Sequence, residues 1–166
     1  MFKALSVILA IFACGSVLSA EGGLKIGDAV PDVGAPDETG TEVKLSSFKD
    51  KSAVIVFFYP QTDTPGCTKE SCGFRDDSKD FEAKGYTLLG ASRDTPADQA
   101  KFKEKFHLNY PLLSDPKGEL ATALGLTPGQ RQSIVIGKDG KVAKVYLKVS
   151  AGTHAKDILK DLEAAK

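Results

Sequence analysis

Apolar residues lie in short runs separated by turn residues over most of this chain. The run over residues 53–59 is continuously apolar and rich in β-branched and aromatic residues, which is typical of a central strand covered on both faces. The tetrapeptide Gly137-Lys138-Asp139-Gly140 separates two later apolar runs and predicts a β-hairpin. The predicted strands cover residues 41–45, 53–59, 86–92, 111–114, 133–136 and 142–147.

Apolar residues at helical spacing predict helices between and after these strands. Cys67, Phe74 and Phe81 recur every seven residues and therefore share one face of a helix expected from residue 67 to about residue 83. The run Thr95-Pro96-Ala97-Asp98 supplies an N-cap, a first-turn proline and a capping-box acid, so it predicts the start of another helix. Further helices are expected at residues 119–124 and 153–165, the latter with Ile158 and Leu162 on its inner face.

The order of these elements predicts the fold class. Strands alternate with helices, and a hairpin and a last helix follow, which implies an α/β sandwich with both parallel and antiparallel strand pairs. The chain has 166 residues, enough for one compact domain with a substantial core. No linker or repeat divides it, so we expect a single domain over residues 21–166.

Residues 1–20 differ from the rest of the chain. Lys3 precedes an apolar stretch over residues 4–13, and small residues follow from Gly15 to Ala20. This layout is typical of a secretory signal peptide, and the apolar stretch is shorter than the ~20 residues of a membrane span. We therefore expect export, either to a bacterial periplasm or toward a plastid or other endomembrane-derived compartment, and no membrane segment in the mature form. The alternatives are a retained N-terminal helix and a lipid attached to Cys14.

Composition and charge are those of an ordinary globular protein. Apolar residues make up 42% of the chain and charged residues 27%, which is ordinary for a globular protein, and the formal net charge is zero. There is no block of basic residues, so a nucleic-acid partner is not indicated. His107 and His154 do not form a convincing zinc site with the cysteines, and we expect both at the surface.

The strongest chemical signal follows the strand at residues 53–59. The segment reads Pro-Gln-Thr-Asp-Thr-Pro-Gly-Cys-Thr-Lys-Glu-Ser-Cys over residues 60–72 and places Cys67 at the start of a helix. Unpaired backbone N–H groups and the positive end of the helix dipole favour the thiolate there, which is the reactive form of cysteine.

These residues resemble a known family. Pro60, Thr64 and Cys67 fit the P-x-x-x-T-x-x-C signature of the peroxiredoxins, and Glu70 fits the acidic residue three places after the cysteine. The run over residues 66–76 is similar to the bacterioferritin-comigratory-protein or peroxiredoxin Q branch.

The resemblance extends from about Lys25 to the C-terminus and includes the segment Gly129-Gln130-Arg131-Gln132-Ser133 before the predicted hairpin. It implies a three-layer α/β/α thioredoxin-like fold with an N-terminal β extension. It also implies a thiol-dependent peroxidase that reduces hydrogen peroxide and organic hydroperoxides without a metal or organic cofactor.

The resemblance further implies a role for each residue of the motif. Cys67 would attack the peroxide and become a sulfenic acid, while Thr64 and Arg131 would bind the reacting oxygens. Glu70 would orient the Arg131 guanidinium, and Pro60 would shield the thiolate from solvent. The implied partners are the peroxide and thioredoxin or a similar dithiol, and the implied assembly is a monomer or weak homodimer.

Each assignment has a simpler alternative. Thr64 could serve only as a helix cap, Arg131 as a surface arginine, Glu70 as a helix-dipole partner, Pro60 as a strand terminator and Cys67 as a small buried apolar residue. The whole chain could instead be a thiol–disulfide oxidoreductase or a holdase-type binding protein. An oxidoreductase on this core normally carries C-x-x-C, and position 64 holds threonine.

Cys72 is the candidate resolving cysteine. Removal of the predicted signal peptide would take Cys14 and leave two cysteines, and an even number of cysteines in an exported protein suggests a structural disulfide. However, residues five apart in an ideal helix have Cα atoms roughly 8.6 Å apart, beyond the ~7 Å limit for a disulfide. A switch between a helical dithiol and a locally unwound disulfide explains the spacing better, and Gly73 weakens the helix where it would unwind.

Overall fold

The computed structural model describes residues 23–164, so the predicted signal peptide and Cys14 lie outside the described residues. The strands are β1 (Gly34–Pro36), β2 (Glu42–Lys44), β3 (Ala53–Phe58), β4 (Tyr86–Ser92), β5 (Leu112–Ser114), β6 (Gln132–Ile136) and β7 (Val142–Tyr146). The helices are η1 (Leu45–Phe48), α1 (Pro65–Asp76), α2 (Ser78–Ala83), α3 (Pro96–Phe106), α4 (Glu119–Ala123) and α5 (His154–Ala164). None of these helices is both long enough and apolar enough to cross a membrane.

A mixed five-stranded sheet forms the centre of the molecule, in the order β5-β4-β3-β6-β7. Strand β3 pairs in parallel with β4 and antiparallel with β6, and all of its residues are buried. Its side chains alternate between two cores: Val54 and Val56 enter one, and Ile55 and Phe57 enter the other. This double burial explains the continuous apolar run, and the predicted central strand is confirmed.

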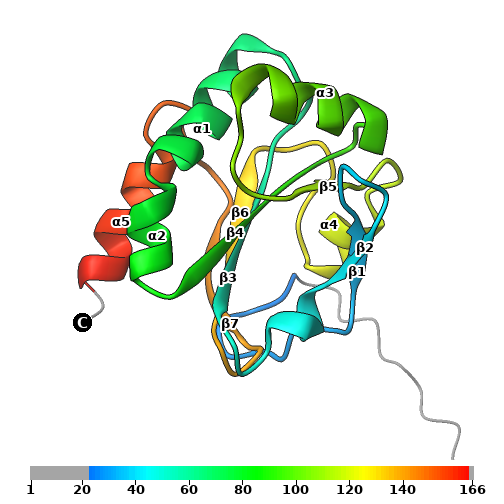
Figure 1. Cartoon of the computed structure of the whole chain (residues 1–166). Helices are drawn as coiled ribbons and strands as arrows, with labels where there is room; N and C mark the ends of the chain where they lie inside the picture. The colour runs from blue at the N-terminus through cyan, green and yellow to red at the C-terminus, as the bar shows by residue number, and fades with distance from the viewer. Residues whose placement is uncertain (1–22, 165–166) are drawn as a thin grey trace, which may run out of the picture.

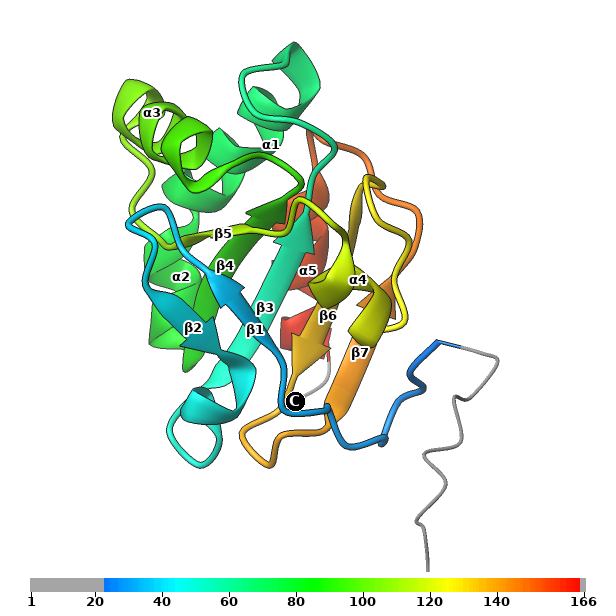
Figure 2. The ribbon, with the colours of Figure 1, turned by 90° about the vertical axis from the view of Figure 1, so that its right-hand side faces the viewer.

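Helices α1, α2 and α5 cover one face of the sheet (Figure 1). Helix α4 and the β1–β2 hairpin cover the other face (Figure 2), and α3 lies beside the edge strand β5. The expected three-layer α/β/α architecture with an N-terminal β extension is therefore confirmed.

Two local predictions need correction. The single helix expected over residues 67–83 is two helices, because Asp77 leaves the helical conformation (φ −92°, ψ 5°) and serves as C-cap of α1 and N-cap of α2. Phe74 and Phe81 still enter the same core, with ring centroids 5.9 Å apart. Strand β1 was not predicted, since it lies in a segment rich in turn residues and pairs only with β2.

The register of the sheet brings distant parts of the chain to one end of β3. Phe58, the last residue of β3, pairs with Gln132, the first residue of β6. Arg131 therefore lies next to the point where the chain leaves β3 for α1. Helix α5 packs against α1 on the same face. Its first residue, His154, reaches this end of the sheet, since its Nε2 lies 2.8 Å from Ser133 Oγ in β6.

Candidate active site

Cys67 occupies the first turn of α1. Thr64 is the N-cap in an extended conformation and Pro65 is the first helical residue, while the backbone N–H of Thr68 donates to the Thr64 carbonyl at 2.8 Å. The Cys67 side chain is buried and its thiol is free. A buried thiol at a helix N-terminus lies where the helix dipole and free N–H groups favour negative charge.

The Thr64 hydroxyl does not cap the helix. It donates to the carbonyl of Gln61 at 3.2 Å, and no side-chain cap bond is formed. The alternative that Thr64 is only a side-chain helix cap is therefore wrong, and its role toward peroxide stays a prediction. Pro60 lies two residues after the end of β3 and is exposed, and its shielding role also stays a prediction.

Arg131 lies against the first turn of α1. Its Nη2 donates to Cys67 Sγ at 3.3 Å, although the two residues are 64 positions apart in the chain. Gly66 permits this approach, because a Cβ atom at that position would lie 3.3 Å from the same Nη2. The Arg131 side chain is only 18% exposed, and this low exposure together with the contact to Cys67 excludes the alternative of a surface arginine.

Glu70 joins the site through the other nitrogen of the guanidinium. Arg131 Nη1 donates to Glu70 Oε2, and the Glu70 side chain is completely buried. Burial acts to lower the pKa of Arg131, but the charges of Glu70 and Cys67 and their hydrogen bonds outweigh it and raise the pKa. The guanidinium is therefore charged, which strengthens its hydrogen bonds to Glu70 and to the Cys67 sulfur.

His154 was predicted at the surface, and this prediction is wrong. The imidazole is buried, with Nδ1 2.6 Å from Glu70 Oε1 and Nε2 2.8 Å from Ser133 Oγ. His154 lies four residues before Ile158 on the inner face of α5, so helical spacing alone could have placed it inside. His107 is exposed, as expected.

Cys72 lies in the same regular helix as Cys67, is half-buried and is also free. The structure thus holds the dithiol form expected before any bridge between the two.

The loop before α1 is held at two points: the Thr62 N–H donates to Asp94 Oδ2 at 2.8 Å, and Lys105 binds both carboxylate oxygens of Asp63 at 2.7 and 2.8 Å.

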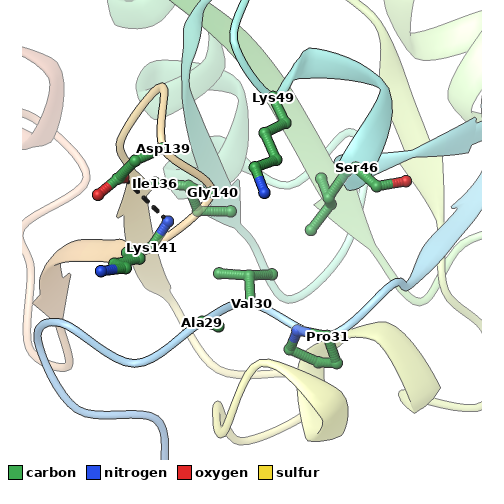
Figure 3. Close-up of a pocket in the computed structure, with 10 residues that line it drawn as sticks. Ala29, Val30, Pro31, Ser46, Lys49, Ile136, Asp139, Gly140 and Lys141 are labelled. Atoms are coloured by element: carbon green, nitrogen blue, oxygen red, sulfur yellow. Dashed lines mark hydrogen bonds between the residues drawn. The ribbon is translucent and has the colours of Figure 1, made fainter.

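A hollow of about 190 Å³ lies away from this site (Figure 3). Its lining includes Val30, Lys49, Ile136 and Lys141. Ile136 pairs with Val54 near the start of β3, whereas Cys67 follows the end of β3, so this hollow does not adjoin the thiol. Within residues 23–164, no group of three or more His, Cys, Asp or Glu residues is arranged to hold a metal ion.

Comparison with known proteins supplies the family. Residues 26–145 match the model of the AhpC/TSA family. A putative peroxiredoxin of Mycobacterium tuberculosis is 41% identical over 152 residues, which cover 86% of this chain and 99% of that protein. Peroxiredoxin bcp1 of Schizosaccharomyces pombe is 45% identical over 107 residues, and the alignment spans 64% of this chain but only 55% of that protein.

A solved structure shows the same fold. The bacterioferritin comigratory protein of Xanthomonas campestris, described for its alkyl peroxide reduction activity, superposes with a TM-score of 0.76 and 26% identity. The match covers 87% of this chain and 99% of that one. The thioredoxin-like fold implied by the resemblance is therefore confirmed. On this evidence the chain belongs to the AhpC/TSA family, and within it to the bacterioferritin-comigratory-protein and peroxiredoxin Q group of thiol-dependent peroxidases.

Proposed function

We propose that Cys67 is the thiol that reduces hydrogen peroxide and organic hydroperoxides in this chain. The observation that carries the proposal is the contact of Arg131 Nη2 with Cys67 Sγ at 3.3 Å in the first turn of α1. The charged guanidinium and the helix N-terminus both favour negative charge at the sulfur and at an oxygen bound beside it.

The first step is an in-line displacement at the O–O bond. The Cys67 thiolate attacks one peroxide oxygen, an S–O bond forms, and the O–O bond breaks with its electron pair on the leaving oxygen. The leaving oxygen takes a proton and departs as water or an alcohol, while sulfur is oxidised to the sulfenic acid. Arg131, bound to Glu70, would donate to the oxygen on which charge develops, and Thr64 is the second candidate donor.

In the second step Cys72 would attack the sulfenic sulfur of Cys67. A disulfide forms and the sulfenic oxygen leaves as water. An external dithiol, thioredoxin or a similar protein, would then reduce the disulfide and be oxidised itself. Ile26 and Leu147 are the largely exposed large apolar side chains of residues 23–164, and this small apolar surface supports a monomer or weak homodimer.

Two substitutions test the proposal. Cys67→Ser should abolish peroxide consumption coupled to thioredoxin oxidation while the fold survives. Arg131→Met should slow peroxide cleavage by about 10²-fold, as for loss of one donor to a developing oxyanion. Alkylation of Cys67 by iodoacetamide should slow much less, because it involves no O–O bond.

Arg93→Met provides the matched control, since Arg93 is exposed and its Nε donates to the Pro116 carbonyl. It should react like the wild type with both reagents. If Cys67→Ser keeps activity within tenfold of the wild type, Cys67 is not the attacking thiol. If Arg131→Met loses both reactions equally, Arg131 only promotes thiolate formation.

Export is a further part of the proposal. Residues 1–20 carry the pattern of a signal peptide, and they lie outside the described residues. The first described element, β1, begins only at Gly34, so cleavage near residue 20 would leave the described fold intact. Sequencing of the mature N-terminus after fractionation tests both the cleavage and the compartment.

A further inference from the structure

We infer that His154 is a positioning residue for the peroxidase reaction and acts on Arg131 through Glu70. The inference rests on the proposed function, because it assigns a task to a residue that does not touch the thiol. The evidence is a continuous line of contacts that runs from Cys67 Sγ to Arg131, then to Glu70, then to His154 and finally to Ser133.

Glu70 needs two partners to hold the guanidinium in one place. Its side chain is completely buried, and each carboxylate oxygen has a separate contact: Oε2 with Arg131 and Oε1 with His154 Nδ1 at 2.6 Å. The terminal torsion of glutamate is soft, so a carboxylate that loses one hydrogen-bond partner can rotate until the unpaired oxygen finds another donor. Because Arg131 is bound to that carboxylate, the rotation would move Nη2 away from the sulfur.

His154 is itself fixed in orientation. Its Nε2 lies 2.8 Å from Ser133 Oγ, and its ring meets the Phe74 ring edge-on with centroids 5.2 Å apart. The Ser133 hydroxyl can donate or accept, so this bond persists whichever form the imidazole takes. Arg131 directly precedes β6 and Ser133 is the second residue of β6, so one short segment of the chain supports both the guanidinium and the partner of His154 Nε2.

The geometry therefore assigns two separable contacts to one imidazole. Nδ1 orients Glu70, and Nε2 anchors the ring. An amide side chain in place of the imidazole can keep one of these two contacts and remove the other. The Asn amide nitrogen lies near the place of Nδ1, and the Gln amide nitrogen lies near the place of Nε2.

The test compares His154→Asn, His154→Gln and His154→Leu in single-turnover oxidation by hydrogen peroxide, with iodoacetamide alkylation as the second reaction. His154→Leu and His154→Gln should slow peroxide oxidation about tenfold or more, since a displacement of ~1 Å in a reacting group costs up to about 10²-fold. His154→Asn should restore the rate to within about threefold of the wild type. Alkylation should change less than threefold in all three variants.

Urea midpoints measured on the same variants separate positioning from stability. All three variants lose part of the native packing, so a purely structural role predicts that the rates follow the midpoints. The inference is overturned if His154→Asn and His154→Gln are equally slow, or if all variants match the wild type. If His154→Leu does not fold, the Asn and Gln variants decide the question alone.

Failure of the inference and failure of the proposed function give different results. A wild type that reduces peroxide, a Cys67→Ser variant that does not, and His154 variants that are as fast as the wild type would overturn only the role of His154. Peroxide reduction that survives in Cys67→Ser would overturn the proposed function itself.

Discussion

At the scale of single residues, Gly66 sets the distance between the guanidinium and the thiol. The position lies in the first turn of α1, where a Cβ would meet Arg131 Nη2 at 3.3 Å. That separation is tighter than ordinary van der Waals contact, so the flexible end of Arg131 would have to give way. Stability and activity thus make opposite demands on this residue.

Gly66→Ala should therefore stabilise the protein and slow the reaction. Alanine is favoured over glycine within helices by up to about 1 kcal/mol, and less than this is expected at a helix end. The displaced Nη2 should lower the rate of peroxide oxidation several-fold. Thermal unfolding and single-turnover oxidation measure the two effects.

Gly73→Ala is the matched control, because a Cβ at Gly73 would meet nothing within 4 Å. It should raise stability without slowing the peroxide step. A Gly66→Ala variant with an unchanged rate would contradict the argument.

Residues of the site differ in how far they could be predicted from the sequence. Cys67, Thr64 and Glu70 lie within one short motif, so their proximity follows from a single helix turn. Arg131 was expected from the resemblance alone, because its approach to Cys67 depends on the register of β3 with β6. The burial of His154 follows from its spacing of four residues from Ile158, but its contact with Glu70 does not, because that contact depends on the packing of α5 against α1.

At the scale of secondary structure, α1 is held in its helical form by contacts with the end of α3 and with the segment that follows it. The Tyr110 hydroxyl donates to the Ser71 carbonyl at 2.7 Å, and Arg75 Nη1 donates to the Phe106 carbonyl at 2.7 Å. Both contacts lie beside Cys72, on the part of α1 that must unwind for Cys67 and Cys72 to bridge.

Tyr110→Phe should accelerate closure of the disulfide. In the wild type, burial raises the pKa of Tyr110, so its hydroxyl keeps the proton that it donates to Ser71. The substitution removes this hydroxyl and leaves the ring in the core. Loss of a hydrogen bond worth about 1 kcal/mol raises the population of the unwound helix about fivefold. Stopped-flow fluorescence or mass spectrometry after one equivalent of peroxide measures the rate of bridge formation.

Tyr86→Phe is the control, because Tyr86 is half-buried against the same core and no side-chain hydrogen bond of its hydroxyl is found within residues 23–164. It should leave the rate of disulfide closure unchanged.

Amide exchange over residues 68–77 should rise when the wild type is oxidised. A bridge between Cys67 and Cys72 with unchanged exchange would show that α1 does not unwind.

The elements themselves were largely predictable, and the exceptions have physical causes. Strands β3 and β4 follow directly from continuous apolar runs, and α3 follows from its cap at Thr95, whose hydroxyl accepts from the Asp98 N–H. The break at Asp77 has no equally strong signal, because the apolar spacing of Phe74 and Phe81 continues across it. Strand β1 depends on pairing with β2 and therefore on contacts that local pattern does not contain.

At the scale of the whole molecule, α1 is part of the core that covers one face of the sheet. Phe74 stacks on Phe57 of β3 with ring centroids 3.9 Å apart and contacts His154 of α5. Unwinding of α1 would therefore loosen the contact between two layers and not only one surface turn.

The disulfide form should consequently be less stable than the dithiol form. A bridge between residues five apart gains only about 2 kcal/mol from loop closure. Full exposure of one large aromatic side chain would cost about 1.5–3 kcal/mol, partial exposure costs a share of this, and broken helical hydrogen bonds add to it. Urea midpoints of the oxidised and reduced protein measure the difference. In Cys72→Ser the two midpoints should agree closely, and a higher midpoint for the oxidised wild type would contradict the expectation.

The line of contacts from Cys67 to His154 also has a consequence for protein synthesis. Glu70 is translated long before His154, which begins the last helix of the described chain. A growing polypeptide therefore contains the thiol early, but it cannot complete the surroundings of that thiol until α5 has left the ribosome and docked. Until then the cysteine has the ordinary reactivity of an unstructured thiol, so premature reaction with peroxide during translation is restrained by the order in which the chain is made.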